Sequence, residues 1–344
     1  MWAEILNVTV IVLFGGPSDE RHVSVASAQN VVRTLGNPLA WFWAHDGPVH
    51  DVAPDDLLAH QRPFEIDFHP RRPAIWPNIE QALDTIPVED PVFFLAVHGT
   101  TGEDGTLQKM MEDRGIAFTG SGSEASAAAF DKGRAKQMLK DRVRNADSQI
   151  LQDPRRLQET VREMLTQYDR VVAKPLAGGS SRGLFFVDRG QKFTEKVDIP
   201  YIVEQCISGR ELTIGVIDRD DGPLALPVLE VEVDAGHSFD YAGKYLGQGT
   251  REICPARISD RMRAAAQDVA LAAHTTLGCE GCTRTDVVAA DDDHIYFLEI
   301  NTLPGLTTSS LVPKELQAAG IAFRDFLELQ IAQARRRVGM SFRA

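Results

Sequence analysis

The chain has 344 residues, of which 43% are hydrophobic and 25% are charged, and its formal net charge is −13. These values are ordinary for a globular protein of two or three domains and exclude a disordered or fibrous chain. The negative charge argues against nonspecific nucleic-acid binding, which needs clustered Lys and Arg. No run approaches the ~18 apolar residues of a membrane span. The start, MWAEILNVTVIVLFGG, lacks a basic region and predicts a first strand, not a signal peptide.

Cysteine usage indicates the compartment. Four cysteines (Cys206, Cys254, Cys279 and Cys282) are too few for a disulfide framework in a chain of this size, which favours a reducing, cytoplasmic location. Cys279 and Cys282 form one CxxC, but no second ligand pair lies at zinc-site spacing, so metal or redox use is disfavoured.

The first third of the chain predicts an α/β unit. The strand VTVIVLFGG ends in Gly15 and Gly16, and Ser18 is a good N-cap for a helix over residues 19–35. A second strand, PVFFLAVHG, ends in His98 and leads through an acidic, Gly-rich turn into a helix near residues 106–114. Ligands bind at the carboxyl ends of parallel strands, so Glu20 and His98 are expected to face one crevice. A structural role is the commoner one for a lone histidine.

Beyond about residue 121 the architecture changes. Helices are predicted over residues 124–144 and 154–168, followed by a hairpin of RVVAKP and LFFVD around the turn LAGGSSRG. The strands YIVEQCI, ELTIGVID and LPVLEVEV then favour an antiparallel sheet. Residues 234–257 predict a long polar loop, and loops of that length in compact chains are usually functional.

The segment DDDHIYFLEINTLPGLTTSSL carries the strongest chemical signal. It predicts a buried strand on which Glu299 and Asn301, two residues apart, share one face. Hard oxygen ligands of this kind suit Mg²⁺, although a strand end with polar caps is the alternative. Arg284 and Asp286 share a face in the same way. Two such strands side by side would form an anion and cation site from four side chains.

Lys174 and the glycines after it predict a phosphate loop. Glycines let backbone N–H groups approach phosphate oxygens, and a lysine adds a point charge. A Walker P-loop is excluded because no GxxxxGK[ST] occurs. The stretch from Gly179 to Gly183 also matches G-x-S-x-G around Ser181, but a nucleophile elbow needs a following helix and LFFV predicts a strand, which disfavours a serine hydrolase. Glu204 and Glu211 are weaker candidates for adenine or ribose contacts.

With these residues in place, the chain resembles the D-alanine–D-alanine ligases of the ATP-grasp superfamily from about residue 10 to 320. The motifs that carry the resemblance are FGGPSDERHVS (14–24), HGTTGEDGTLQ (98–108), FTGSG (118–122), DK (131–132), AKPLAGGSSRG (173–183), VEQCISGREL (203–212), FDYAGKY (239–245), EICPA (252–256), TRTD (283–286) and LEINTLPGLTTSSLVPK (298–314). The resemblance implies a three-domain ATP-grasp fold of α/β and α+β class. Its parts would be an N-terminal α/β domain (1–121), a central lobe (122–207) and a C-terminal lobe with metal site and mobile loop (208–344).

The resemblance also implies roles on the nucleotide side. Lys132 and Lys174 would contact the ATP phosphates, and Lys244 would reach the γ-phosphate. The other implied residues are the adenine hinge (Glu204, Gln205 and Ile207), the ribose acceptor Glu211, and the ligands of two Mg²⁺ ions, for which Mn²⁺ could substitute (Asp286, Glu299 and Asn301).

On the amino-acid side, Glu20 would hold the ammonium of the first D-alanine, with Val23 and His98 beside it. Arg284 and the Gly305 amide would bind the developing oxyanion. Ser310 and Leu311 would receive the carboxylate of the second D-alanine, and Ser180 and Tyr245 would link with Glu20 to close the loop over the site.

The expected function is therefore ATP-dependent joining of two D-alanines, with release of ADP and phosphate through a D-alanyl phosphate, for peptidoglycan precursors. A homodimer is usual for such proteins. Two departures stand out: Arg182 replaces a small aliphatic residue, and the linker after Arg144 lacks an expected proline segment. The alternatives are a related ligase with D-serine, D-lactate or another amino acid as acceptor, and a non-catalytic nucleotide-binding homologue. Tyr245 favours an amine acceptor.

Overall fold

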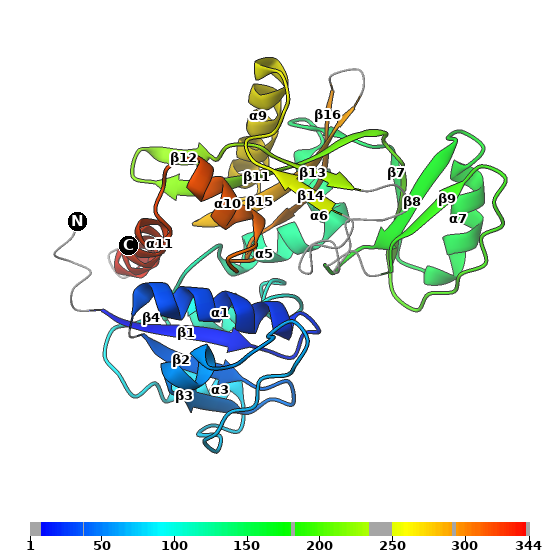
Figure 1. The fold of residues 1–344 in the computed structure, drawn as a ribbon. Coiled ribbons are helices and arrows are strands. Elements are labelled where there is room, and N and C mark those ends of the chain that lie inside the picture. Colours follow the sequence, from blue (N-terminus) through cyan, green and yellow to red (C-terminus); the bar gives the residue numbers. More distant parts are fainter. Residues whose placement is uncertain (1–7, 37, 180–182, 234–249, 291–293, 342–344) are drawn as a thin grey trace.

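In the part of the chain that the structure describes, the strands form three β-sheets (Figure 1). The computed structural model describes residues 8–36, 38–179, 183–233, 250–290 and 294–341. Within this part of the chain, no helix is long and apolar enough to cross a membrane. The mixture of parallel and antiparallel sheets with covering helices agrees with the predicted α/β and α+β class.

The N-terminal sheet is mostly parallel, with the strand order β3-β2-β1-β4-β5. Both faces of β1 are buried: Val12 and Phe14 belong to one apolar cluster, and Ile11 and Leu13 to the other. A strand covered on both faces must be apolar throughout, which explains the run TVIVLFG. The elements are β1 (Thr9–Gly15), α1 (Arg21–Leu35), β2 (Leu39–Trp43), β3 (Val49–Val52), α2 (Pro54–Leu58), α3 (Ile79–Asp84), β4 (Pro91–Leu95), α4 (Thr106–Glu112) and β5 (Ala117–Phe118).

Helix α1 begins two residues later than predicted, at Arg21, and its N-cap residue is Glu20. Ser18 does not cap the helix; its Oγ accepts a hydrogen bond from the Glu20 backbone N–H at 3.1 Å. A second hydroxyl, Ser24 Oγ, accepts from the Gly15 N–H at 2.7 Å and fixes the turn between strand and helix. The tightened turn leaves the Glu20 side chain at the carboxyl end of β1.

The second sheet is antiparallel, with the order β7-β10-β8-β9, and one of its faces packs on α7 (Figure 1). The predicted hairpin of β8 and β9 is confirmed, because Val171 pairs with Val187 in an antiparallel register. The predicted helix over residues 154–168 is shorter than expected and follows a 3₁₀ turn. The elements are β7 (Ser148–Leu151), the turn Pro154–Arg156, α7 (Leu157–Met164), β8 (Arg170–Pro175), β9 (Phe185–Asp188) and β10 (Tyr201–Gln205).

The third sheet has seven strands, in the order β14-β13-β11-β15-β16-β6 with β12 beside β11. Residues 250–253, predicted as loop, form a strand that pairs with β13, so the described end of that segment is ordered structure. The strand YIVEQCI belongs to the second sheet and not to this one. The elements are β6 (Arg144–Asn145), β11 (Gly209–Arg219), β12 (Gly222–Ala225), β13 (Leu229–Val233), β14 (Thr250–Ile253), α9 (Asp260–Thr276), β15 (Cys282–Ala290), β16 (Ile295–Asn301), α10 (Leu311–Ala318) and α11 (Phe323–Ser341).

The single helix predicted over residues 124–144 is two helices, α5 (Ser123–Phe130) and α6 (Lys132–Leu139). Asp131 adopts an extended backbone at the break, and its carboxylate accepts a hydrogen bond from the Arg134 N–H at 2.9 Å, which caps α6. The break lets the Lys132 N–H donate to the Leu176 carbonyl at 3.0 Å. Lys132 therefore starts a helix beside the glycine loop that follows β8. Both helices share an apolar core with β16 and α9.

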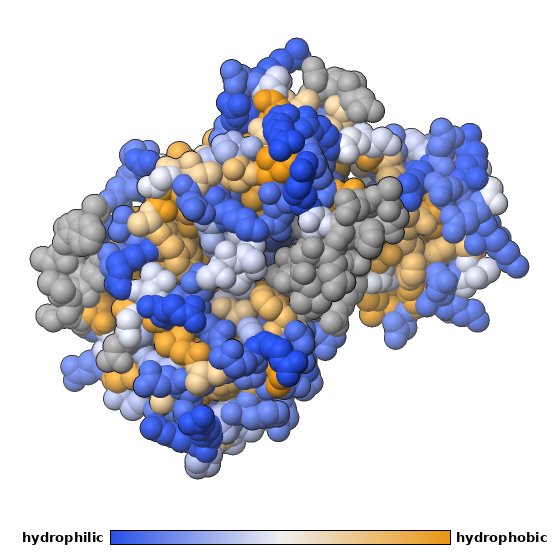
Figure 2. All heavy atoms as spheres, in the orientation of Figure 1, coloured by the Kyte–Doolittle hydropathy of each residue, from blue (hydrophilic) through white to orange (hydrophobic). Residues whose placement is uncertain are grey.

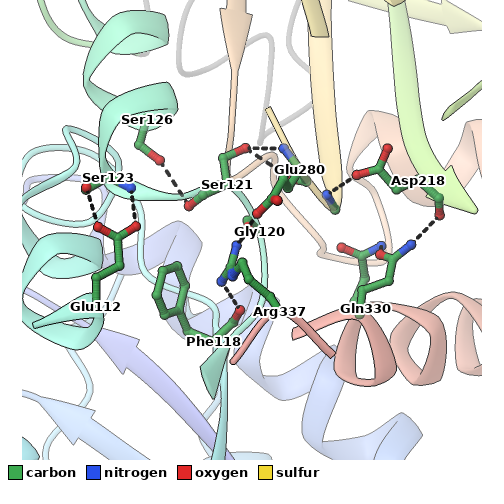
Figure 3. Close-up of polar contacts among 12 residues, drawn as sticks. Glu112, Phe118, Gly120, Ser121, Ser123, Ser126, Asp218, Glu280, Gln330 and Arg337 are labelled. Carbon is green, nitrogen blue, oxygen red and sulfur yellow. Dashed lines mark hydrogen bonds and ion pairs between the residues drawn. The ribbon is translucent and has the colours of Figure 1, made fainter. Parts of the chain in front are cut away.

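The joint between the N-terminal sheet and the rest of the chain is held by α11 (Figure 3). Arg337 donates to the carbonyl oxygens of Phe118 and Gly120 at 2.6 and 2.8 Å and pairs with Glu280 at 2.5 Å. Ser121 Oγ donates to the Glu280 carbonyl and accepts from the Glu280 N–H. The chain thus leaves the first sheet at a point that is tied to the C-terminal helix.

Candidate functional site

The site is built on two neighbouring strands, β15 and β16. Their antiparallel register places Arg284 opposite Asn301 and Asp286 opposite Glu299. Residues opposite one another or two apart project from the same face, so the four side chains form one cluster, as predicted. Arg284 makes two hydrogen bonds to the Asp286 carboxylate, at 2.9 and 2.8 Å. Thr213 Oγ1 donates to the same carboxylate at 2.8 Å.

Glu299 connects this cluster to the central helices. Its Oε2 lies 3.3 Å from Lys132 Nζ, which also donates to the Gly178 carbonyl at 2.7 Å. Lys132 is buried, so its charge is compensated locally and not by water. Asn301 Oδ1 accepts a hydrogen bond from the Leu303 N–H at 2.8 Å, which orients the amide and starts the loop after β16.

The donor set suits Mg²⁺. Two carboxylates and one amide oxygen are the hard ligands that Mg²⁺ takes, with water and phosphate oxygens completing the octahedron. In the described residues no group of three His, Cys, Asp or Glu side chains could hold a metal ion. A cation here would therefore depend on Asp286, Glu299 and Asn301 together with ligands from outside the protein, which agrees with a metal that accompanies a nucleotide.

Glu204 lies at the centre of the nucleotide side, buried between two lysines. Its two carboxylate oxygens lie 2.7 Å from Lys136 Nζ and 2.7 Å from Lys174 Nζ. Burial alone would raise the pKa of Glu204, but Lys174 and Lys136 outweigh it and hold the pKa below its usual range. Burial alone would lower the pKa of Lys174, but the Glu204 and Glu299 carboxylates outweigh this effect and raise it. The two lysines thus favour the ionised form of Glu204, and the two carboxylates favour the charged form of Lys174.

The sheet face beside Glu204 is partly apolar. Glu204 lies opposite Val172, which lies opposite Phe186, and Lys174 lies opposite Ile202, which lies opposite Ile150. Phe186 and Ile150 are 41% and 48% exposed, which is unusual for apolar side chains of that size. Figure 2 shows hydrophobic residues on the right-hand lobe, over the region of β8 and β9. An exposed apolar face next to buried cations suits a planar base attached to phosphates.

The other residues predicted for the nucleotide side, where the structure describes them, lie at the end of the second sheet and the start of the third. Gln205 ends β10, and its N–H donates to the Asp147 carbonyl at 2.9 Å. Ile207 follows it, half-buried, in the connection to β11. Glu211 is on β11, opposite Val288 of β15. Lys244, Tyr245 and Ser180 lie outside the described residues, as do Ser181 and Arg182.

The amino-acid side lies at the carboxyl ends of β1 and β4. His98 is buried, its Nε2 is 3.2 Å from Ser27 Oγ, and its Nδ1 is 3.3 Å from Glu103 Oε1. Burial raises the pKa of Glu103, an effect that His98 opposes and the Glu20 carboxylate reinforces. Glu20 lies close to the His98–Glu103 pair, at the carboxyl ends of β1 and β4. Val23, one turn further along α1, is buried.

Glu20 also reaches the phosphate loop of the central sheet. A Cβ atom on Gly179 would lie 3.2 Å from Glu20 Oε2, and one on Gly99 would lie 2.9 Å from the same atom. Gly99 has a φ of +75°, a conformation that favours glycine. Because Gly99 and Gly179 have no Cβ atom, the Glu20 side chain fits between the turn after His98 and the phosphate loop after β8.

Helix α1 touches the loop after β16 as well. Ser27 Oγ accepts from the Leu306 N–H at 3.1 Å, and Asn30 donates to the Leu306 carbonyl at 2.8 Å. Gly305, next to Leu306, is buried. Ser310 precedes α10, and its Oγ lies 2.7 Å from Thr307 Oγ1 and accepts from the Thr307 N–H at 3.1 Å. Ser310 and Leu311 thus form a buried helix start.

Three buried ionisable residues near the candidate site were not predicted from the sequence: Lys136, Glu103 and Glu315. Glu315, on α10, is fully buried, and its Oε2 accepts from the Gly215 N–H at 2.7 Å. Its Oε1 has no hydrogen-bond partner among the described residues, and burial raises its pKa well above the usual range. A Cβ on Gly215 would come within 2.4 Å of that carboxyl, so the glycine is required there. In the sequence, the burial of Glu315 could have been indicated only by a helical pattern that places position 315 on the buried face of its helix.

Comparisons with known proteins agree with this geometry. The sequence matches the family description "D-ala D-ala ligase N-terminus" over residues 9–121 and "D-ala D-ala ligase C-terminus" over residues 143–332. A curated D-alanine--D-alanine ligase of Leptospira interrogans is 32% identical over 353 residues, which cover 94% of this chain and 99% of that protein.

Solved structures are similar over the same length. The D-alanine-D-alanine ligase from Coxiella burnetii superposes with a TM-score of 0.78 at 25% identity, covering 97% of each chain. The VanG D-Ala:D-Ser ligase from Enterococcus faecalis superposes with a TM-score of 0.74 at 25% identity, covering 94% of this chain and 98% of that one.

Proposed function

The chain belongs to the D-alanine–D-alanine ligase family, and we propose that it joins two D-alanines with ATP to give D-alanyl-D-alanine, ADP and phosphate. The product serves as a peptidoglycan precursor. The observation that carries the proposal is the side-by-side placement of Arg284–Asp286 and Glu299–Asn301 next to Lys132. A carboxylate is a poor acyl donor, so a ligase of this class needs phosphate-binding cations, carboxylates for a metal and an oxyanion site in one place.

The nucleotide binds between the second and third sheets. Lys132 and Lys174 contact the phosphates, and the half-exposed apolar face with Phe186 and Ile150 packs against the base. Gln205 and Ile207 supply backbone groups to adenine, and Glu204 and Glu211 supply acceptors to the base and ribose. Asp286, Glu299 and Asn301 would hold two Mg²⁺ ions, which would neutralise charge on the transferring phosphoryl group.

The first D-alanine binds with its ammonium on Glu20, beside Val23 and His98. The Ser27–His98–Glu103 chain holds the imidazole in place. One carboxylate oxygen of the substrate attacks the γ-phosphorus, the bond to the ADP oxygen breaks, and D-alanyl phosphate forms. Lys132 and Lys174 offset the charge that moves in this step. The buried lining excludes water, which would hydrolyse the acyl phosphate.

The second D-alanine binds with its carboxylate at Ser310 and Leu311, the start of α10. Its amine attacks the acyl carbon, and the tetrahedral oxyanion is stabilised by Arg284 and the Gly305 N–H. The intermediate then expels phosphate and the peptide bond remains. Lys244, Tyr245 and Ser180, which lie outside the described residues, are assigned to the closing loop through the resemblance of their motifs.

A second candidate is a ligase with the same first substrate and a different acceptor. The similarity to a D-Ala:D-Ser ligase favours D-serine as the alternative, followed by D-lactate. The assignment of a cytoplasmic homodimer and the division into parts at residues 121 and 207 also belong to the proposal. The shared core of α5, α6, β16 and α9 supports moving residues 123–145 to the C-terminal lobe.

An acceptor panel tests the proposal. The purified protein is incubated with ATP, Mg²⁺ and D-alanine, alone or with D-serine, D-lactate or L-alanine, and phosphate release and product mass are recorded. We expect D-alanyl-D-alanine from D-alanine alone, with one phosphate released per dipeptide. Formation of D-alanyl-D-serine in preference to the D-alanine dipeptide would support the second candidate, and no D-alanine-dependent phosphate release would contradict both.

A further inference from the structure

Three lysines of the nucleotide side, Lys132, Lys136 and Lys174, are buried. The proposed mechanism assigns roles to Lys132 and Lys174 but none to Lys136. It is on α6, one turn after Lys132, and it is only 6% exposed. A lysine is rarely buried without a specific partner, because removing the ammonium from water is costly. Its position therefore needs an explanation that packing alone does not provide.

Three elements meet at the Lys136 ammonium. Nζ lies 2.7 Å from Glu204 Oε1 on β10 and donates to the Phe297 carbonyl on β16 at 3.2 Å. Nζ also lies over the Phe297 ring, 5.6 Å from its centre. Phe297 is two residues before Glu299, so Lys136 joins the strand of the metal ligands to the sheet that carries Lys174. Burial lowers the pKa of Lys136, and the Glu204 carboxylate opposes that effect.

The charge balance changes when a nucleotide arrives. In the free protein, Glu204 has two cations, Lys136 and Lys174, each at 2.7 Å. Contact of Lys174 with phosphate removes one of them. A buried carboxylate left with no cation is strongly destabilising, so Glu204 must keep a second counter-ion if Lys174 is to move. Lys136 is already bound to the other carboxylate oxygen and to a backbone carbonyl, and so it can stay.

We propose that Lys136 is a positioning residue for nucleotide binding: it remains on Glu204 as a fixed counter-ion while Lys174 exchanges Glu204 for a nucleotide phosphate. This inference rests on the proposed ATP-dependent function. It assigns the three lysines separate tasks. Lys132 and Lys174 bind phosphate, and Lys136 keeps Glu204 ionised and in place when Lys174 leaves.

The test is a double-mutant cycle on nucleotide affinity. Mg²⁺-ADP binding is titrated calorimetrically for the wild type, Lys136→Met, Glu204→Gln and the double variant. Methionine keeps the length of the side chain and removes its charge. Lys140→Met is the matched control, because Lys140 is an exposed lysine at the end of the same helix. The thermal unfolding of each variant without nucleotide is measured in parallel.

We expect Lys136→Met to weaken ADP binding about 10- to 100-fold, since nucleotide binding would then leave the buried Glu204 carboxylate without a counter-ion. In the Glu204→Gln background, Lys136→Met should cost little further affinity, because the carboxylate that needed the counter-ion is gone. Without nucleotide, Lys136→Met should lose little stability, since Lys174 still pairs with Glu204. Lys140→Met should match the wild type in both measurements.

Two results would overturn the inference. One is ADP affinity in Lys136→Met within about twofold of the wild type. The other is an equal loss of ADP affinity from Lys136→Met in the wild-type and Glu204→Gln backgrounds, which would show that Lys136 acts through packing. If Lys136→Met fails to fold, the double variant must fold and bind ADP, and its failure to fold would also overturn the inference. A wild type that does not bind Mg²⁺-ADP at all would instead contradict the proposed function.

Discussion

Glu204 and Glu315 are both almost fully buried, and their surroundings differ. Glu204, on the nucleotide side, lies between two lysines, and its pKa is held low. Glu315, beside the amino-acid side, has one backbone N–H as its partner among the described residues, and burial raises its pKa. Burial acts in the same direction on both, so the neighbouring charges decide which one is ionised.

The two regions follow the same division. Lysines and carboxylates of the nucleotide side are paired within 3.3 Å of one another. The amino-acid side is held mostly by hydroxyl, imidazole and backbone hydrogen bonds around Ser27, His98 and Ser310. A highly charged ligand can replace one member of an ion pair, whereas a small zwitterion is selected by shape and a few hydrogen bonds. We therefore expect charge changes to act on turnover and hydroxyl changes to act on amino-acid affinity.

The largest effect is expected for Arg284→Met. It removes a donor to the oxyanion, a loss that typically lowers turnover by roughly 10²- to 10³-fold, and it also leaves Asp286 without its two hydrogen bonds from Arg284. The measurement is kcat at saturating ATP and D-alanine. Turnover within about threefold of the wild type would remove Arg284 from the oxyanion site.

Glu299→Gln tests the metal assignment. It removes one of two carboxylates that would hold Mg²⁺, and we expect Mg²⁺-dependent turnover to fall by about 100-fold, with a higher Mg²⁺ requirement. Thermal unfolding should change little, because the amide keeps the shape of the side chain. Glu163→Gln, an exposed acid on α7, is the control. An unchanged Mg²⁺ dependence in Glu299→Gln would show that the metal lies elsewhere.

Glu315→Gln tests the contrast between the two buried acids. Burial raises the pKa of Glu315, so the wild type should lose stability as pH rises above the ordinary glutamate pKa, by up to about 1.4 kcal/mol per pH unit. The glutamine variant lacks this loss, and its advantage should grow from pH 5 to pH 8 in urea unfolding. Glu204→Gln should behave in the opposite way, because the lowered pKa of Glu204 contributes stability that is present above the ordinary glutamate pKa and is lost as pH falls below it. Parallel pH profiles for wild type and Glu315→Gln would mean that Glu315 is ionised.

The smallest effect is expected for Ser310→Ala. It removes the acceptor for the Thr307 N–H and a donor for the second substrate, which is worth about 0.5–1.5 kcal/mol. The KM for the D-alanine acceptor should rise up to about tenfold while the KM for ATP stays constant. Ser309→Ala, the exposed neighbour, is the matched control. An equal rise in the KM for ATP would contradict the assignment of Ser310 to the amino-acid side alone.

Local periodicity predicted the strands of the site correctly. Two-residue spacing placed Arg284 with Asp286 and Glu299 with Asn301, and the observed register joins the two pairs. The strand and glycine pattern around Gly15 and Gly99 likewise predicted that Glu20 and His98 lie close together, at the ends of two neighbouring strands. These predictions needed only side-chain direction, which the strand fixes.

The errors have physical causes that lie beyond local pattern. The break between α5 and α6 arises because Asp131 caps α6 and pairs with the chain near Ala177, a contact between distant segments. Lys136 resembles any helical lysine in sequence, and only the approach of Glu204 and Phe297 shows that it is buried. Glu315 is similar, since its burial depends on Gly215, 100 residues away. Such groups depend on tertiary contacts that a single sequence does not reveal.

The central claim is that ATP activates the carboxylate of the first D-alanine. D-alanine labelled with ¹⁸O in its carboxylate, incubated with the protein, ATP and Mg²⁺, tests it directly by mass spectrometry of the released phosphate. Transfer through D-alanyl phosphate predicts one labelled oxygen in each phosphate, because the attacking carboxylate oxygen leaves with the phosphoryl group. Phosphate that carries no label from D-alanine would contradict the account.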